Sequence, residues 1–374
     1  MLDYFRESGI NIPMYTLGKT VAFDWRYGYR TDSVIEDFEM AFFTPHSMMF
    51  EPRMSEDRSL VMEFLSRSKM TATDEEWNAY VQLLHEDPAF YKKEVNGLQL
   101  SDEERDTLKY MEHLLKAHQK GRSHQAMKEI LRSLLYSTCP IDAYLWIGRW
   151  LAVGEDEQYE FFRKAAGMAE LASREYKLHQ HLDTLWSDVC YRPFLRGRAV
   201  FQDRLLSFKL TQKELNPALK GMLDLVKLDK LDAMGLRFLL MQYYLLNKKY
   251  AEMEKLCQDY PADELNPLFL YPLAMMRFHT LGGKHEKALE TLQKAIHSNP
   301  FYLYYFFTDE LKVIPVYPES IYLPGSPEEA SYMLSISLSL WCQRNPALED
   351  WMLKHFDDHL KSINAPFRGG SAIA

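Results

Sequence analysis

The segment from Lys284 to Pro300, KHEKALETLQKAIHSNP, constrains the fold of this chain more than any other stretch. Its apolar residues recur with the period of an α-helix and share one face: Ala288, Leu289, Leu292, Ala295 and Ile296. The two alanines are small enough to let another helix approach closely. The glycine pair 282–283 precedes this helix, and the apolar run from Leu268 to Leu281 precedes the glycines. The sequence therefore predicts a helical hairpin whose second helix is Lys284 to Pro300.

A glycine turn followed by an alanine, a bulky apolar residue, a second alanine and a proline is the pattern of a tetratricopeptide (TPR) repeat. Aligning the second helix of each candidate hairpin gives the equivalent positions Ala126, Tyr159, Leu215, Met253 and Ala288, at intervals of 33, 56, 38 and 35 residues. Three intervals are close to the TPR period of about 34. The interval of 56 residues implies an inserted or lengthened helix, for which Arg174 to Val189 is the candidate.

This repetition predicts an all-α chain: a TPR-like helical-hairpin solenoid with an irregular N-terminal helical region. We expect residues 1–100 to form that mostly helical N-terminal region, 101–361 the array with its C-terminal capping helices, and 362–374 a flexible tail. Helices are predicted at residues 31–43, 56–67, 77–84, 108–118, 125–136, 141–152, 157–171, 235–246 and 250–259. The segment from Val21 to Arg30 fits either a strand or an ordered loop.

Several helix starts carry a capping box, in which a hydroxyl and a carboxylate three residues apart satisfy free backbone amides. The pairs are Thr73 with Glu76, Ser101 with Glu104, and Ser326 with Glu329, and Ser55 can cap the helix from Glu56. These signals position helices and carry no catalytic chemistry. The prolines at 315, 318 and 324 exclude a regular helix from Leu311 to Gly325, so we expect an extended strap there.

Composition limits the functional classes. The formal net charge of −9 disfavours nucleic acid as the main partner. The four cysteines lack the paired spacing of a metal site, and we interpret them as buried free thiols of a reducing compartment. We find neither a signal peptide nor a run of about 18 apolar residues, so we expect a cytoplasmic protein without membrane contact. No cofactor is expected.

Two histidine motifs are the nearest approach to a metal site. His179 with Asp183, and His355 with His359, stand four residues apart and would share a helix face. Exposed helix residues are the favoured interpretation of both pairs. The chain also lacks the glycine-rich phosphate loops and the nucleophile elbow, Gly-x-Ser-x-Gly. We therefore expect a protein that is not an enzyme.

The candidate partner-binding residues are Arg192, Arg196, Arg237 and Tyr243. Arg192 and Arg196 lie four apart on a predicted helix, where two guanidinium groups could hold a carboxylate or a phosphate. Pairing with neighbouring Asp or Glu inside the molecule is the favoured alternative. The aromatic run Phe301 to Phe307 fits a buried helix better than an exposed contact surface, and so does Tyr243.

A set of residues between Arg192 and Trp351 recurs in a known group of proteins: Arg192, Pro193, Phe194, Arg196, Met222, Leu223, Gly235, Arg237, Asn299, Pro300, Tyr305, Ile314, Pro315, Gly325, Ser326, Glu329, Ala330, Tyr332 and Trp341. With these residues the chain resembles the suppressor of tumorigenicity seven family and uncharacterised bacterial TPR proteins. The chain departs from the family at Tyr302 and Leu303, where valine and proline are favoured, and it lacks the membrane segments of the animal members. The resemblance implies a helical interaction scaffold without an agreed activity.

The sequence thus favours a non-catalytic scaffold that binds an unidentified protein or peptide on the concave surface of the array. Two alternatives stay open. One is a ligand-responsive regulator or a self-assembling, homo-oligomeric structural protein that uses the aromatic C-terminal part. The other is an enzyme whose site residues are too dispersed to recognise.

Overall fold

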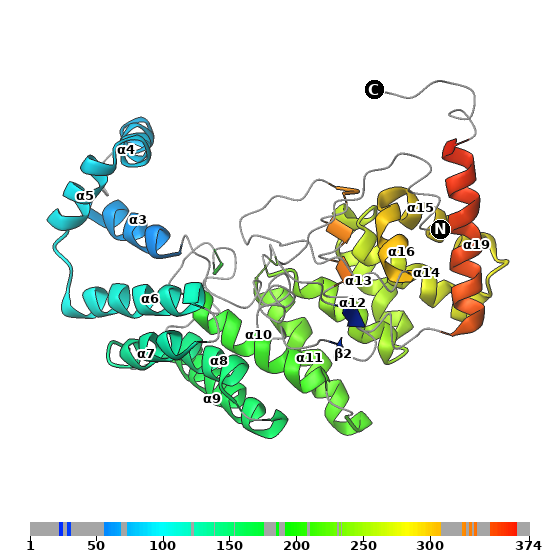
Figure 1. Cartoon of the computed structure of the whole chain (residues 1–374), viewed down its shortest axis with the longest axis horizontal. Helices are drawn as coiled ribbons and strands as arrows, with labels where there is room; N and C mark the ends of the chain where they lie inside the picture. The colour runs from blue at the N-terminus through cyan, green and yellow to red at the C-terminus, as the bar shows by residue number, and fades with distance from the viewer. Residues whose placement is uncertain are drawn as a thin grey trace. The chain divides into compact units, whose positions relative to one another are not determined.

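The computed structural model describes residues 22–24, 28–30, 56–68, 73–120, 123–137, 139–152, 154–175, 185–186, 191–207, 210–229, 232, 234–307, 324–326, 329–330, 333–334 and 345–364. Every regular element in these ranges is a helix except one small hairpin (Figure 1). In it, β1 (Ala22–Asp24) pairs antiparallel with β2 (Gly28–Arg30), and Phe23 stands opposite Tyr29. The prediction of an all-α chain is confirmed for these residues, apart from the hairpin. Of the two interpretations of Val21 to Arg30, a strand or an ordered loop, the strand is correct. None of the described helices has the length and apolar character needed to span a bilayer.

The chain forms two compact units. We call residues 50–209 with 227–233 the first unit, and residues 210–226 and 234–374 with 1–49 the second unit. Residue 100 lies inside the first unit, and the domain boundary expected there stays a prediction.

The first unit contains eight of the described helices: α3 (Glu56–Ser68), α4 (Asp74–Glu86), α5 (Pro88–Gly97), α6 (Asp102–Lys120), α7 (His124–Ser133), α8 (Ile141–Trp150), α9 (Glu155–Glu175) and α10 (Arg192–Ser207). The capping box of Thr73 and Glu76 is present at the start of α4. At the start of α6, the amide of Glu104 donates to the Ser101 hydroxyl at 3.2 Å, and the amide of Ser101 donates to the Glu104 carboxylate at 2.9 Å. Both predicted boxes in this unit are therefore confirmed.

Some boundaries differ from the prediction. α7 ends at Ser133 instead of Tyr136, and α9 runs from Glu155 to Glu175, longer at both ends than the predicted 157–171. The added length of α9 overlaps the start of the predicted insertion at Arg174. Most of Arg174 to Val189 lies outside the described residues, as do Ser55 and the predicted helix at 31–43.

Helix α10 packs closely against α8 and α9 because it carries glycine at the crossing point. A Cβ atom built on Gly197 would lie 2.7 Å from the Ile141 Cγ2 of α8, and 3.2 Å from both the Ala165 carbonyl oxygen and the Ala169 Cβ of α9. These distances are shorter than ordinary van der Waals contact. The three helices thus share one tight junction.

The second unit contains η4, a short 3₁₀ helix (Pro261–Asp263), and seven of the described α-helices: α11 (Gln212–Leu228), α12 (Leu236–Leu246), α13 (Tyr250–Asp259), α14 (Pro267–Leu281), α15 (Glu286–Ser298), α16 (Pro300–Phe307) and α19 (Pro346–Asn364). The last turn of α11 falls beyond the unit's boundary at residue 226. Short turns, residues 247–249 and 282–285, join α12 to α13 and α14 to α15, as predicted.

The α14 and α15 helices form an antiparallel hairpin. Arg277 donates to the Thr291 hydroxyl, and the Tyr271 hydroxyl donates to the Asn299 carbonyl oxygen at 2.9 Å. In each pair the two residues lie at about equal distances in sequence before and after the turn at 282–285, as expected for antiparallel helices. Four of the five predicted face residues of α15 are fully buried: Ala288, Leu292, Ala295 and Ile296. Gly282 has a positive φ of 87°, a conformation that L-residues other than glycine rarely adopt. The hairpin prediction is confirmed.

Asn299 joins the end of α15 to the segment that contains Ser326 and Glu329. Its side-chain nitrogen donates to the Ser326 carbonyl oxygen at 3.0 Å and to the Glu329 carboxylate at 2.8 Å, and Asn299 is fully buried. The amide of Glu329 donates to the Ser326 hydroxyl at 3.1 Å, whereas the Glu329 carboxylate accepts from the Gly325 amide at 2.7 Å. Residues that carried the family resemblance therefore meet in one polar network, and they have a structural role there.

The aromatic helix α16 belongs to the interior of the second unit. Tyr302, Leu303, Tyr304, Tyr305 and Phe306 are all buried. Most of the predicted strap lies outside the described residues, and α19 extends through residues 362–364 of the predicted tail. The buried side chains confirm the core interpretation of this run, so α16 does not supply an exposed aromatic surface.

Candidate functional site

Arg196 lies inside the first unit and is fully buried. Its Nε and Nη2 atoms donate to the two oxygens of Asp142 on α8, at 2.9 and 2.7 Å. Burial raises the pKa of the neighbouring Tyr110, and the negative charge of Asp142 adds to that effect. The partner-binding hypothesis is wrong for Arg196, whose guanidinium group is enclosed. The favoured alternative, pairing with an Asp or Glu inside the molecule, holds for it, with a carboxylate 54 residues away in the sequence.

Arg192 is half-buried and turned toward the backbone of its own unit. Its Nε donates to the Trp186 carbonyl oxygen at 2.8 Å, and its guanidinium carbon lies 5.1 Å from the centre of the Trp186 ring. These contacts hold the start of α10, since Arg192 is the first residue of that helix. Arg192 and Arg196 therefore do not form a two-pronged anion clamp.

Arg237 lies on α12 of the second unit and forms an ion pair with Asp263 of η4. Its Nε donates to the Asp263 carboxylate at 2.7 Å, and its guanidinium carbon lies 4.2 Å from the Phe238 ring centre and 5.4 Å from that of Tyr260. The side chain of Asn266 donates to the same carboxylate at 3.5 Å and caps α14 by accepting from the Leu268 amide at 2.9 Å. Arg237 thus fixes the connection between α13 and α14.

Tyr243 points into the core of the second unit and is 8% exposed, which agrees with the buried interpretation of this residue. Its ring therefore offers little surface to a partner. Arg237, by contrast, contacts two residues that line a pocket, Asp263 and Tyr260.

This pocket has a volume of about 430 Å³ and lies between α13, η4 and the first half of α14. Phe269, Leu270 and Leu273 of α14 supply apolar walls, and Cys257 and Gln258 of α13 face them. Asp263 and Tyr260, the two groups that Arg237 contacts, also line it. The volume lies within the range typical of small-ligand sites, about 300 to 1,000 Å³.

Charged side chains from both helices also line the pocket. Glu254 of α13 and Glu264, just after η4, are exposed carboxylates, and no ion pair involves either of them among the residues that the structure describes. Arg277 of α14 is half-buried and donates to Thr291 of α15. Its charge also lowers the pKa of Glu290, although Lys294 is the larger cause of that shift. The charge at this pocket is therefore mainly negative.

Cys257 is a half-buried thiol on the pocket wall, and Cys139 in the first unit is half-buried as well; neither forms a disulfide. The interpretation of buried free thiols is thus too strong for these two, while Cys190 and Cys342 lie outside the described residues. Burial raises the pKa of Cys257 to about 11. A thiol with that pKa is almost entirely protonated at neutral pH, so Cys257 is suited to packing and not to nucleophilic attack.

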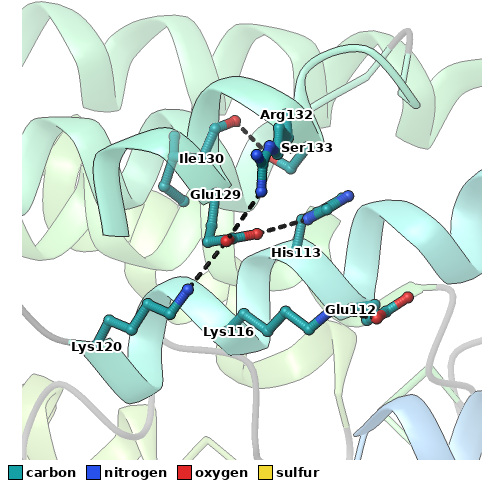
Figure 2. A network of polar contacts seen from close by, with 8 residues as sticks. All are labelled: Glu112, His113, Lys116, Lys120, Glu129, Ile130, Arg132 and Ser133. Atoms are coloured by element: carbon teal, nitrogen blue, oxygen red, sulfur yellow. Dashed lines mark hydrogen bonds and ion pairs between the residues drawn. The ribbon is translucent and has the colours of Figure 1, made fainter. Parts of the chain in front are cut away.

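A second polar cluster lies in the first unit, at the interface of α6 and α7. Figure 2 shows His113, Lys120 and Arg132 converging on the carboxylate of Glu129, which accepts from them at 2.8, 2.9 and 3.3 Å. Hydrogen bonds from Lys120 and His113 lower the pKa of Glu129 to about 2. The Tyr136 ring stacks on His113, with ring centres 5.7 Å apart. The cluster joins two helices through one buried carboxylate, and Lys120 and Arg132 both pair with it.

The histidine motifs do not form a metal centre in the described part of the chain, where no three potential ligands come together. His179 and Asp183 lie outside the described residues. His355 and His359 lie on α19, and the ring of His359 meets that of His297 from α15, with centres 4.6 Å apart. Burial is the main cause that lowers the pKa values of His355 and His359.

No family model, no curated protein and no solved structure matches this chain. The family resemblance noted in the sequence therefore stays an expectation. The pocket residues were missed by sequence reasoning, because they come from two helices of different hairpins and show no local motif. The one local signal is the turn between Tyr260 and Pro267, where two prolines and the capping Asn266 fix how α13 leads into α14.

Proposed function

We propose that this chain is a non-catalytic, TPR-like scaffold whose second unit binds a protein or peptide at the pocket between α13 and α14. The observation that carries the proposal is the position of this pocket, between the α12–α13 hairpin and the α14–α15 hairpin. In arrays of helical hairpins, the surface between successive repeats is where extended partners bind. A cytoplasmic location is part of the same proposal, and the net charge of −9 argues against nucleic acid as the partner.

The construction of the pocket supports this function. Its apolar side is built on α14, which is held by α15 through the buried alanines 288 and 295 and by the Asn266 cap. Arg237 and Asp263 hold the opposite side. A binding surface needs such rigid support, because a partner then loses little affinity to ordering the site.

Photo-crosslinking tests the proposal directly. Gln258 is exposed at the pocket, and its replacement by p-benzoylphenylalanine places a reactive group there. The matched control carries the same residue at Gln293, which is exposed on α15 away from the pocket. We expect a discrete heterologous adduct in cells from position 258 alone, and its loss when Leu273→Trp fills the pocket.

The outcomes separate the candidate functions. Adducts from both positions, or from neither, would contradict a binding site at the pocket. An adduct with the mass of two copies of this chain would instead support the self-assembling alternative, and light scattering of the purified protein would then give a stable oligomer. Charge reversal at Arg192 and Arg196 is no test of binding, because Arg196→Glu would place two carboxylates together in the core.

A further inference from the structure

We propose that the α13–α14 pocket selects a peptide segment in which an apolar side chain stands next to a lysine or an arginine. This inference rests on the proposed function and adds to it the chemistry of the partner. It contrasts with the acidic or carboxylate partner that the arginine pair suggested, since Arg196 is enclosed and Arg192 is turned toward the backbone.

The apolar half of the recognition comes from α14. Phe269 and Leu270 are buried, and Leu273 is partly exposed one turn further along, so the pocket offers an apolar surface that water covers poorly. The ring of Phe238 meets that of Phe269 edge-on, with centres 5.6 Å apart, which fixes the orientation of this wall. A volume of about 430 Å³ is near the lower end for ligand pockets, so it suits one or two side chains and excludes a whole helix.

The charged half comes from Glu254 and Glu264. Asp263 is compensated by Arg237 at 2.7 Å, whereas no described ion pair compensates these two carboxylates. Arg277 is the one cation among the described residues of the pocket lining and is half-buried, whereas Glu254 and Glu264 are two exposed carboxylates. The exposed charge that a ligand meets is therefore negative, and a cationic neighbour of the apolar side chain would be attracted there.

The overall negative charge of the chain also favours a basic ligand over an acidic one. A net charge of −9 attracts a basic segment over a distance of about one Debye length, roughly 8 to 10 Å at physiological salt, and speeds its encounter with the pocket. Salt weakens this attraction, so binding of a basic segment should become weaker as ionic strength rises.

Fluorescein-labelled hexapeptides provide the test, with binding measured by fluorescence anisotropy. The probes are Gly-Ser-Trp-Lys-Ser-Gly, its acidic counterpart with Glu in place of Lys, and Gly-Ser-Ser-Lys-Ser-Gly without the apolar anchor. We expect the first peptide to bind at least about tenfold more tightly than either of the others. A preference for the acidic peptide, or no saturable binding of the first peptide up to about 1 mM, would overturn the proposal.

Charge reversal at the pocket identifies the carboxylates. Glu254→Lys with Glu264→Lys should reverse the preference between the lysine and glutamate peptides. The matched control, Glu252→Lys with Glu286→Lys, changes the net charge equally at exposed positions outside the pocket lining and should leave the preference intact. Equal effects of the two double variants would overturn the assignment to Glu254 and Glu264, because only the overall charge would then matter.

The crosslinking experiment keeps this inference separate from the proposed function. If position 258 gives its adduct while the hexapeptides show no basic preference, the pocket binds a partner of other chemistry and this inference alone fails. If no adduct forms at position 258, the proposed function itself fails.

Discussion

At the scale of single residues, the Arg196–Asp142 pair and the Glu129 cluster each connect helices in the first unit, and they differ in their access to water. The pair of Arg196 and Asp142 is enclosed, with both side chains at most 1% exposed. Glu129 is also buried, but its partners Lys120 and Arg132 reach solvent. Breaking the enclosed pair leaves a charge without water or a partner, whereas the Glu129 cluster is partly screened.

The first prediction follows from the enclosed pair. Arg196→Met keeps much of the side-chain volume but leaves the Asp142 carboxylate buried and unpaired, so we expect a loss of about 3 to 5 kcal/mol in the free energy of unfolding, measured with urea. Removing both charges, in Asp142→Ala with Arg196→Met, should be less costly than Arg196→Met alone. Arg163→Met is the control, because Arg163 pairs with Glu160 on the exposed face of α9 and should show no measurable change. A loss no larger than that of the control would contradict the buried pair.

The second prediction concerns the pH dependence of stability. The folded state lowers the pKa of Glu129 from 4.5 to about 2, so below 4.5 the unfolded state binds the proton more readily than the folded state does. The stabilisation is complete above about pH 4.5 and is lost as the pH falls toward 2. Because Lys120 and Arg132 reach solvent, which screens their charges, we expect a contribution of about 1 kcal/mol.

Glu129→Gln isolates this contribution. The difference in unfolding free energy between the unaltered protein and this variant should be constant from pH 7 to 5 and shrink between pH 4.5 and 3. A difference that stays constant down to pH 3 would show that the carboxylate charge has no role in joining α6 to α7.

At the scale of elements, two glycines inside helices of the first unit lie in opposite environments. An added Cβ atom on Gly197 of α10 would have atoms of α8 and α9 within 3.2 Å, whereas one on Gly167 of α9 would have nothing within 4 Å. Glycine weakens a helix through its backbone entropy, so replacing it by alanine stabilises wherever the methyl group fits. Replacing glycine by alanine should therefore raise the free energy of unfolding at position 167 and lower it at position 197.

We expect Gly167→Ala to stabilise the protein by about 0.5 to 1 kcal/mol and Gly197→Ala to destabilise it by about 1 to 3 kcal/mol. Urea unfolding of the two variants, with helix content checked by circular dichroism, measures both effects. If both substitutions stabilise, α10 does not pack as closely against α8 and α9 as these distances require.

The elements also divide into those that the sequence predicts and those that it does not. Periodicity predicts α12 to α15 closely, and the glycine pair 282–283 marks the turn between α14 and α15, because a hairpin is determined by contacts between residues close in sequence. The enclosed pair cannot be recognised this way, since Arg196 and Asp142 are 54 residues apart and each resembles a surface charge in its own helix. The repeat alignment selects a buried position in four of its five helices: Ala126, Leu215, Met253 and Ala288. In the remaining helix it selects Tyr159, which is half-buried, whereas the buried residue there is Phe162.

At the scale of the whole molecule, the chain consists of two compact units with separate sets of buried residues. Because the two units are compact by themselves, local damage in one of them need not unfold the other. A destabilising substitution should accordingly loosen the unit that contains it more than the other one. A substitution in the Arg196–Asp142 pair perturbs the first unit, and one at the fully buried Leu292 of α15 perturbs the second.

Hydrogen exchange followed by mass spectrometry tests this independence. Arg196→Met should speed amide exchange in α8, α9 and α10 while leaving α14 and α15 unchanged. Leu292→Ala removes buried methyl groups, at a cost of about 2 to 5 kcal/mol, and should speed exchange in α14 and α15 while leaving α8 to α10 unchanged. Equal acceleration in both units by either variant would mean that the chain opens as one cooperative body. The pocket between α13 and α14 would then depend on the first unit, and Arg196→Met would weaken binding there without contacting the ligand.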